Sequence, residues 1–270
     1  MKTQTTKIIA ICLLVVMAIS VWFCKRGFAQ TDDTLNQGLV MYLSFDTIEE
    51  ISGQKLIVDE SGHENHGTLL SGQIADGKIG NALKCSAINK SDGVRVKDND
   101  SLDLDAVTMA AWIKTEQIDG QWNRILDKGW NSAYNLCIGG DYEGKNWYRT
   151  HAQLECAGKL MTSKAVVTDN QWHFVVGTYD GQALRLYIDG KLDIVRELKK
   201  PENPEGKSKW DVAAPMKHNN VDIMIGRLAM PEPNPYEHAF FDGLIDEVRL
   251  YNRVLSAEEV RKLYQLKNNN

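Results

Sequence analysis

The stretch that decides the fold lies near the C-terminus, where residues 241–256 read FDGLIDEVRLYNRVLS. Apolar and polar residues alternate along it, which is the period of an extended strand with one buried face. On this alternation Asp246 shares a face with Val248 and Leu250, so its carboxylate is expected among apolar side chains. A buried carboxylate without a partner is costly. We therefore expect Asp246 to meet a cation, a set of backbone N–H donors or a metal ion.

A short helix is expected directly after this strand. Ser256 and Glu259 have the spacing of a capping box, in which each side chain binds the other residue's backbone N–H. Val260, Leu263 and Tyr264 then give the helix one apolar stripe. The sequence thus predicts a C-terminal helix that packs across the rest of the domain.

The remainder of the chain has the pattern of an antiparallel all-β protein. Short runs rich in Val, Ile, Leu and aromatic residues recur between Gly, Asn and Asp breaks, and they are too numerous for one open sheet. Asp189-Gly190 is the strongest hairpin signal. A two-residue turn there puts Leu192 on the face of Tyr187, so either both faces of the hairpin are partly covered or a bulge resets the phase.

Several blocks follow one another in a fixed order: LSFD at 43–46, DESGHENHGT at 59–68, GNALK at 80–84, QWHFVVGTYDG at 171–181, LRLYIDGK at 184–191, and the stretch quoted above. In order and spacing they resemble the laminin-G-like jelly rolls of the concanavalin-A-like lectin and glucanase superfamily. The resemblance covers nearly all of the chain after its N-terminus. It implies an all-β, two-sheet antiparallel jelly-roll sandwich with a short C-terminal helix.

The N-terminus reads as an export signal. Lys2 and Lys7 precede an uncharged run over 8–24, and small residues at 27 and 29 fit cleavage after Ala29. We predict a signal peptide over 1–29, a linker over 30–37 and one jelly-roll domain over 38–267, which places the protein in the periplasm or outside the cell. Because the uncharged run reaches the short end of a membrane span, an uncleaved N-terminal anchor stays an alternative.

The charge balance excludes some partners. The formal net charge is −5, and cleavage after Ala29 would remove four basic residues and no acidic one. A chain this acidic is not expected to attract nucleic acid or an anionic membrane surface. Membrane contact is expected only through an uncleaved N-terminus. Neutral sugars, cationic groups and divalent metal ions fit better.

Three cysteines, Cys85, Cys137 and Cys156, remain after cleavage. Export permits disulfides, and Cys137 and Cys156 flank an expected hairpin with its turn near 142–144, so a bridge between them is predicted. The alternative is three buried thiols that pack as small apolar groups.

Calcium is the expected metal. Asp59 and Asn65 are hard oxygen ligands on a tight turn, which suits this ion. In the resembled family a calcium ion often ties this early loop to the last strand, which implies Asp59, Asn65 and Asp246 as ligands, with Asp46 as a further one. The alternative is a loop without metal, in which Asp246 accepts backbone N–H groups.

The aromatic residues divide into two groups. Trp112 and Trp172 fall inside strand patterns and are expected to pack in the core. Others stand beside Gly, Asn and Lys in expected turns, where they could stack on the apolar face of a sugar while a polar neighbour binds its hydroxyls. The predicted ligand-binding residues are Trp130, Trp147, Tyr148, Arg149 and Trp210. The alternative is that they cap the sandwich edge.

No catalytic residue is assigned. Asp242 and Asp246 share a face but lie about 13 Å apart along a strand, too far for the carboxyl pair of a retaining glycosidase. We therefore predict an exported, non-catalytic module that binds carbohydrate or a cell-surface glycoconjugate and carries structural calcium. A protein–protein adhesion domain is the alternative, followed by a glucanase-type hydrolase.

Overall fold

The computed structural model describes residues 33–86, 88–89, 91–116, 122–129, 133–139, 150–199, 212–229 and 239–266. The chain divides into two compact units, 1–37 and 38–270. In the first, the described residues form a 3-10 helix, η1 (Asp33–Leu35). The predicted signal peptide lies outside the described residues. Within the described ranges, no helix is both long enough and apolar enough to cross a membrane.

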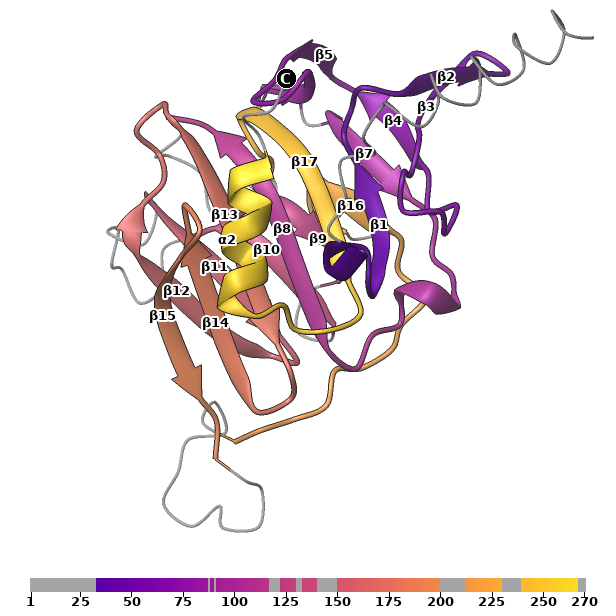
Figure 1. Cartoon of the computed structure of the whole chain (residues 1–270). Coiled ribbons are helices and arrows are strands. Elements are labelled where there is room, and N and C mark those ends of the chain that lie inside the picture. Colours follow the sequence, from indigo (N-terminus) through magenta and orange to yellow (C-terminus); the bar gives the residue numbers. More distant parts are fainter. Residues whose placement is uncertain are drawn as a thin grey trace, which may run out of the picture. The chain divides into compact units, whose positions relative to one another are not determined.

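The second unit is built from two antiparallel sheets (Figure 1). In order, the eight-stranded sheet contains β15 (Lys191–Glu197), β14 (Ala183–Ile188), β13 (Trp172–Tyr179), β8 (Val107–Lys114), β17 (Gly243–Tyr251), β6 (Asn81–Cys85) and β5 (Gln73–Asp76), while β1 (Leu39–Leu43) also pairs with β17. The nine-stranded sheet contains β12 (Lys159–Val166), β11 (His151–Cys156), β10 (Tyr134–Ile138), β9 (Asn123–Asp127), β16 (Ile223–Ile225), β7 (Gly93–Val96), β4 (Gly67–Ser71), β3 (Gln54–Ile57) and β2 (Ile48–Ile51).

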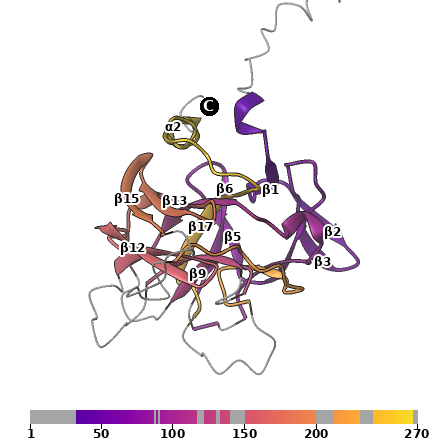
Figure 2. The same cartoon turned by 90° about the horizontal axis from the view of Figure 1, so that it is seen from below.

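The two sheets face each other across one apolar core, so the predicted all-β sandwich is confirmed. Leu136 and Leu154 of the nine-stranded sheet and Ile245 of the eight-stranded sheet are fully buried members of this core. The helix α2 (Ala257–Gln265) lies on the outer side of the eight-stranded sheet (Figure 2). A second 3-10 helix, η2 (Asp100–Leu102), follows β7 in the chain.

Strand β17 departs from the strict alternation read from the sequence. Its pairing with β8 shifts between Asp246 and Arg249, and Glu247 has a φ of 55°, so a β-bulge resets the phase. Ile245 and Val248 therefore both point into the core, while Asp246 lies opposite Trp112. The prediction that Asp246 shares its face with Val248 and Leu250 is wrong for this reason.

A β-bulge also changes the strand register in the hairpin at Asp189-Gly190. Both turn residues have positive φ, as a type I′ turn requires, and Ile188 pairs with Lys191. The register then shifts, so that Leu186 lies opposite Ile194. Of the two alternatives that the sequence left open, the structure has the bulge.

The C-terminal helix begins as predicted. The Glu259 backbone N–H donates to Ser256 Oγ, and Glu259 accepts from the Ser256 backbone N–H at 2.8 Å. Val260 and Leu263 are buried, and the Tyr264 ring stacks on Trp112 at 5.4 Å between centroids. Trp112 is thus buried under the helix. Trp172 is partly exposed, so its predicted place in the core is wrong.

Candidate functional site

Three adjacent strands, β9, β10 and β11, carry polar side chains on the face of the nine-stranded sheet that points away from the core. Their sequence neighbours Leu126, Leu136 and Leu154 belong to the core, and side chains alternate along a strand. We call this set the outer polar array. It consists of Arg124 and Asp127 of β9, Asn135 of β10, and Gln153 and Glu155 of β11.

Strand register arranges the outer polar array in two rows. In one row Asp127 lies opposite Asn135, which lies opposite Glu155. In the other, Arg124 lies opposite Cys137, which lies opposite Gln153. A register shift in β9 brings Arg124 rather than Ile125 opposite Cys137, and this places the guanidinium on the polar face.

Hydrogen bonds join the rows. Arg124 Nη1 donates to Asn135 Oδ1 at 3.0 Å, and Asn135 Nδ2 donates to Glu155 Oε2 at 3.1 Å. Asp127 accepts the backbone N–H of Gly129 at 2.9 Å and of Ala229 at 3.0 Å, one on each oxygen. Arg124, Asp127, Asn135 and Glu155 are therefore joined in one network.

Two buried atoms of the array keep unused hydrogen-bonding capacity. Arg124 Nε lies 3.4 Å from Asp127 Oδ2 as an ion pair but makes no hydrogen bond, and Gln153 Oε1 accepts none, within the part of the chain that the structure describes. The other end of the Gln153 amide donates to Thr162 Oγ1 at 3.1 Å, which fixes its orientation. An unmet buried polar atom costs about 1 to 3 kcal/mol, so a group that bonds to it gains most of that back.

Within the array, Arg124 and Asp127 form an ion pair at 3.4 Å. Burial alone would lower the pKa of Arg124, but Asp127, Cys137 and Glu155 together outweigh this effect and raise the pKa. Burial raises the pKa of Asp127. Both Asp127 oxygens nevertheless accept N–H groups, and that arrangement suits the ionised carboxylate. The guanidinium of Arg124 is thus paired with Asp127. The carboxyl group of Glu155 accepts a hydrogen bond from Asn135 in the same row.

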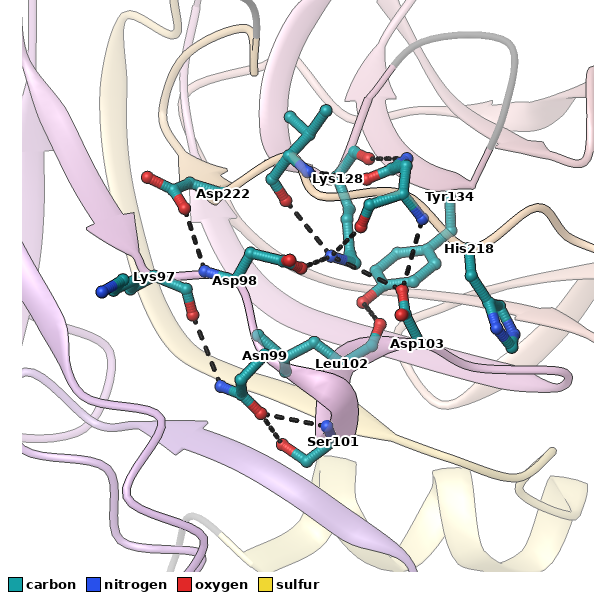
Figure 3. Close-up of polar contacts among 12 residues, drawn as sticks. Lys97, Asp98, Asn99, Ser101, Leu102, Asp103, Lys128, Tyr134, His218 and Asp222 are labelled. Atoms are coloured by element: carbon teal, nitrogen blue, oxygen red, sulfur yellow. Dashed lines mark hydrogen bonds and ion pairs between the residues drawn. The ribbon is translucent and has the colours of Figure 1, made fainter.

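A buried ammonium anchors the end of β9 directly after Asp127. Lys128 is 0% exposed, and its Nζ donates to Asp98 Oδ1, to the carbonyl of Val221 at 3.1 Å and to that of Asn219 at 3.3 Å (Figure 3). Asp103 Oδ1 lies 3.9 Å away. All three ammonium protons thus have oxygen partners, and the side chain ties β9 to the segments around residues 98–103 and 219–221.

Further contacts brace these segments. The Asp98 backbone N–H donates to Asp222 Oδ1 at 2.9 Å (Figure 3). Asn219 Nδ2 donates to the Lys128 carbonyl at 3.0 Å. Tyr134 at the start of β10 donates its hydroxyl to the Leu102 carbonyl at 2.9 Å. The strand ends that carry the outer polar array are therefore held from outside the sheet.

The four predicted calcium ligands fall into two pairs. Asp59 accepts the backbone N–H groups of Tyr42 at 2.7 Å and Asn65 at 2.9 Å as well as the Ser61 hydroxyl, and the Asn65 amide binds the Val40 carbonyl. These oxygens are already used to shape the 59–65 loop. Among the described residues, no hydrogen bond joins this pair to Asp46 or Asp246.

Asp46 and Asp246 lie on either side of the turn at 77–81. Asp246 Oδ2 accepts the N–H groups of Lys78 at 2.8 Å and Ile79 at 2.9 Å, and Asp46 Oδ1 accepts that of Asn81 at 2.6 Å. Asp246 therefore has backbone N–H donors, one of the kinds of partner expected for a buried carboxylate. Its Oδ1 is buried without a hydrogen-bond partner in the described chain, and burial raises the pKa of the carboxyl to about 7.

The predicted disulfide is absent. Cys137 and Cys156 are both free and buried, as is Cys85. Cys137 lies opposite Gln153, whereas Cys156 lies opposite Tyr134, so the two cysteines are three residue pairs apart and on opposite faces of the sheet. Three pairs correspond to about 10 Å along a strand, beyond the reach of a disulfide. The alternative of buried thiols is the one that the structure contains.

The predicted ligand-binding residues Trp130, Trp147, Tyr148, Arg149 and Trp210 lie outside the described residues. Chain connectivity still relates most of them to the array, because residues 128–133 join β9 to β10 and residues 139–150 join β10 to β11. The outer polar array itself was not predicted from sequence. In the described ranges, no group of three or more His, Cys, Asp or Glu side chains is arranged to hold a metal ion.

Comparison with known families identifies the chain. The family model described as the Concanavalin A-like lectin/glucanases superfamily matches residues 89–261. The chain belongs to this superfamily and carries a laminin-G-like domain. None of the curated proteins is a significant match to the sequence.

Solved structures share the fold. Domain 4 of AbnA, an extracellular arabinanase from Geobacillus stearothermophilus solved in complex with arabinotriose, is 22% identical, with a TM-score of 0.57 over 84% of this chain and 98% of that one. The binding domain of Paraclostridial Mosquitocidal Protein 1 is 18% identical, with a TM-score of 0.59 over 85% and 52%. The ligand binding domain of botulinum neurotoxin serotype D, solved with N-acetylneuraminic acid, is 17% identical, with a TM-score of 0.57 over 86% and 52%. The chain thus spans about half of these toxin domains.

Proposed function

We propose that this member of the superfamily is an exported, non-catalytic module that binds carbohydrate at the outer polar array. The observation that carries the proposal is the pair of buried polar atoms, Arg124 Nε and Gln153 Oε1, that lack hydrogen-bond partners on one face of the described sheet. Ligand sites typically place a few polar groups of this kind where they fix a ligand's orientation. A sugar hydroxyl, which both donates and accepts, can satisfy either atom.

Two structural neighbours support a carbohydrate ligand. The arabinanase domain was solved with arabinotriose and the neurotoxin domain with N-acetylneuraminic acid. The predicted aromatic residues would complete the site, because Trp147 and Tyr148 belong to the connection between β10 and β11. Stacking of these rings on a sugar would complement hydrogen bonds from the array. An export signal at residues 1–29 would bring the module to extracellular glycans.

The array gives no support to glycoside hydrolysis. Asp127 and Glu155 are separated by two strand spacings, about 10 Å, whereas a retaining pair needs roughly 5 Å. The separation is close to that of an inverting pair, but Asp127 is 0% exposed and both of its oxygens accept backbone N–H groups. Such a carboxylate is buried and fixed by backbone donors, so it is poorly placed to activate a water. The proposed module therefore binds without turnover.

The proposal includes a structural calcium ion at Asp46 and Asp246. The fit rests on Asp246 Oδ1, a buried carboxylate oxygen without a hydrogen-bond partner in the described chain. Gly77 and Gly80 let the turn approach both carboxylates, since a Cβ at either position would collide with one of them. Backbone carbonyls would have to supply further oxygens, as calcium takes six to eight. Asp59 and Asn65 do not fit, because N–H and O–H donors already occupy their oxygens.

A glycan microarray probed with the purified protein tests the proposed function. We expect binding that free sugar competes and that Gln153→Ala reduces, with Gln182→Ala in the exposed turn after β13 as the matched control. Binding to a cell-surface protein that no sugar competes would instead favour the adhesion-domain alternative. Release of reducing sugar from any polysaccharide by the purified protein would contradict the absence of turnover.

A further inference from the structure

The two sheets end next to one another on one side of the sandwich. Strand β15 ends the eight-stranded sheet, β12 ends the nine-stranded sheet, and side chains of β15 bind the backbone of β12 (Figure 1). The last strand of a sheet carries N–H and C=O groups that can pair with a strand of another molecule. Val166 of β12 and Leu192 and Val195 of β15 are 48%, 50% and 44% exposed, so this side also offers apolar surface to such a strand.

A β-bulge in β15 directs Asp193 toward the neighbouring sheet. The register with β14 shifts between Leu192 and Ile194, which leaves Asp193 as an extra residue with no residue opposite it on β14. Asp193 Oδ2 accepts the Lys164 N–H at 2.5 Å, and its Oδ1 accepts the Ala165 N–H at 3.2 Å. Both oxygens of the carboxylate therefore bind the backbone of β12.

Strand β12 is irregular at the same place. Its ladder with β11 has three residues, 163–165, where β11 has one, Ala152. The Ser163 hydroxyl accepts the Ala152 N–H at 3.0 Å, so a side chain serves β11 where a backbone carbonyl normally would. The N–H groups of Lys164 and Ala165 are directed toward β15 instead of β11.

Arg196 supplies the complementary contact. Its Nη1 donates to the Leu160 carbonyl of β12 at 2.7 Å. Asp193 thus binds donors of the β12 backbone and Arg196 binds an acceptor, and these are the two kinds of group that strand pairing uses. Bulges and charged side chains that point inward are known means by which the last strand of a sheet avoids pairing with another chain.

We infer that Asp193 and Arg196 close this side of the sandwich against pairing with a second copy of the chain. Without Asp193, the Lys164 and Ala165 N–H groups would be open to β12 of another molecule. Two copies of one strand can pair antiparallel about a twofold axis, which gives a closed dimer. The exposed Val166 would lie within that contact. The inference concerns self-association and is independent of the proposed function.

Analytical ultracentrifugation of Asp193→Ala tests the inference. We expect the variant to self-associate at concentrations at least about tenfold below those at which the parent does. Amide hydrogen exchange gives a second readout, at a concentration where the variant is dissociated. The Lys164 and Ala165 amides should be protected in the parent and exchange faster in the variant, because their acceptor is gone.

Two further variants serve as controls. Asp180→Ala removes the same charge and also leaves two N–H groups without their acceptor, those of Gln182 and Ala183, but in a turn rather than on the last strand of a sheet. It should associate no more readily than the parent. Val166→Lys in the Asp193→Ala background should reverse the association, because two lysines would then meet across the twofold contact.

Each result supports or overturns the inference. Folded Asp193→Ala that associates no more readily than the parent would overturn it, as would equal association of Asp180→Ala. Association that Val166→Lys leaves unchanged would also overturn it, since the contact would then lie elsewhere. If Asp193→Ala fails to fold, Asp193→Asn keeps one acceptor oxygen and should show a smaller gain, and no gain would again count against the inference.

Discussion

Replacement of Lys128 by Met is the sharpest test of how the site is supported. Met keeps the apolar stem of the side chain but removes the ammonium that joins Asp98, Val221 and Asn219. The change leaves a carboxylate and two carbonyls without their donor. We expect the variant to fold but with a clearly lower free energy of unfolding.

The magnitude follows from the burial of the partners. Loss of one member of a buried ion pair typically costs 3 to 5 kcal/mol. Lys128 is 0% exposed, but the Asp98 and Asp103 side chains are 20% and 24% exposed and keep part of their hydration. The lower end, about 3 kcal/mol, therefore applies, and for a domain of this size it lowers the melting temperature by about 6 to 12 °C.

Urea unfolding of the parent and of Lys128→Met measures this difference in the free energy of unfolding. The comparison holds when both proteins have the same dependence of that free energy on urea concentration. Lys262→Met is the control, because Lys262 and Glu258 form an exposed pair at 3.7 Å on α2, and such pairs contribute about 0.5 kcal/mol or less. Asp98→Asn should also cost less in the Lys128→Met background than in the parent, since the pair is already broken. A loss below about 1 kcal/mol for Lys128→Met would refute the reasoning that this ammonium holds the segments around β9.

Three further expectations concern the rest of the domain. Calcium at a hundredfold excess over its dissociation constant should add about 2.7 kcal/mol to the free energy of unfolding. A chelator should reverse this effect, and Asp246→Asn should abolish it. A melting curve that does not change with calcium would contradict the proposed site. Hydrogen bonds to Asp189 at 2.9 Å and Asp169 at 3.0 Å raise the pKa of His173 above its usual value, so its contribution to stability is complete below about pH 6.5 and is lost as pH rises through the folded-state pKa. Melting temperatures from pH 5 to 9 should show this decline in the parent and a flatter profile in His173→Gln; equal slopes would disprove it. Alkylation in denaturant without reductant should modify all of Cys85, Cys137 and Cys156, whereas protection of any two would mean that a disulfide forms.

Much of the fold was predictable because it depends on local patterns. The capping box at Ser256 and Glu259 and the turn at Asp189-Gly190 each need only neighbouring residues, and the structure has both. The phase of β17 was not predictable in the same way. It depends on a bulge at Glu247, a residue type without a preference for positive φ, so the alternation written in the sequence misplaced Asp246.

The outer polar array left a signal that alternation could have revealed. Residues 134–138 read YNLCI and residues 151–156 read HAQLEC, so polar Asn135, Gln153 and Glu155 alternate with residues of the core. Which residues of neighbouring strands lie opposite one another could not be predicted from this alternation. They depend on the register of β9, where a shift brings Arg124 opposite Cys137. That same long-range register separates Cys137 from Cys156, which sequence spacing alone had joined.

The buried Lys128 holds the end of β9, the strand that carries Arg124 and Asp127 of the outer polar array. Asp127 and Lys128 are consecutive and project to different sides of the strand. Lys128 fixes the backbone through three oxygen partners, while Asp127 orients Arg124 in the array. Because the end of β9 is held by contacts outside the sheet, Arg124 keeps its position although its Nε makes no hydrogen bond in the described chain. If the array binds sugar as proposed, the rigid strand end would reduce the conformational entropy lost on binding.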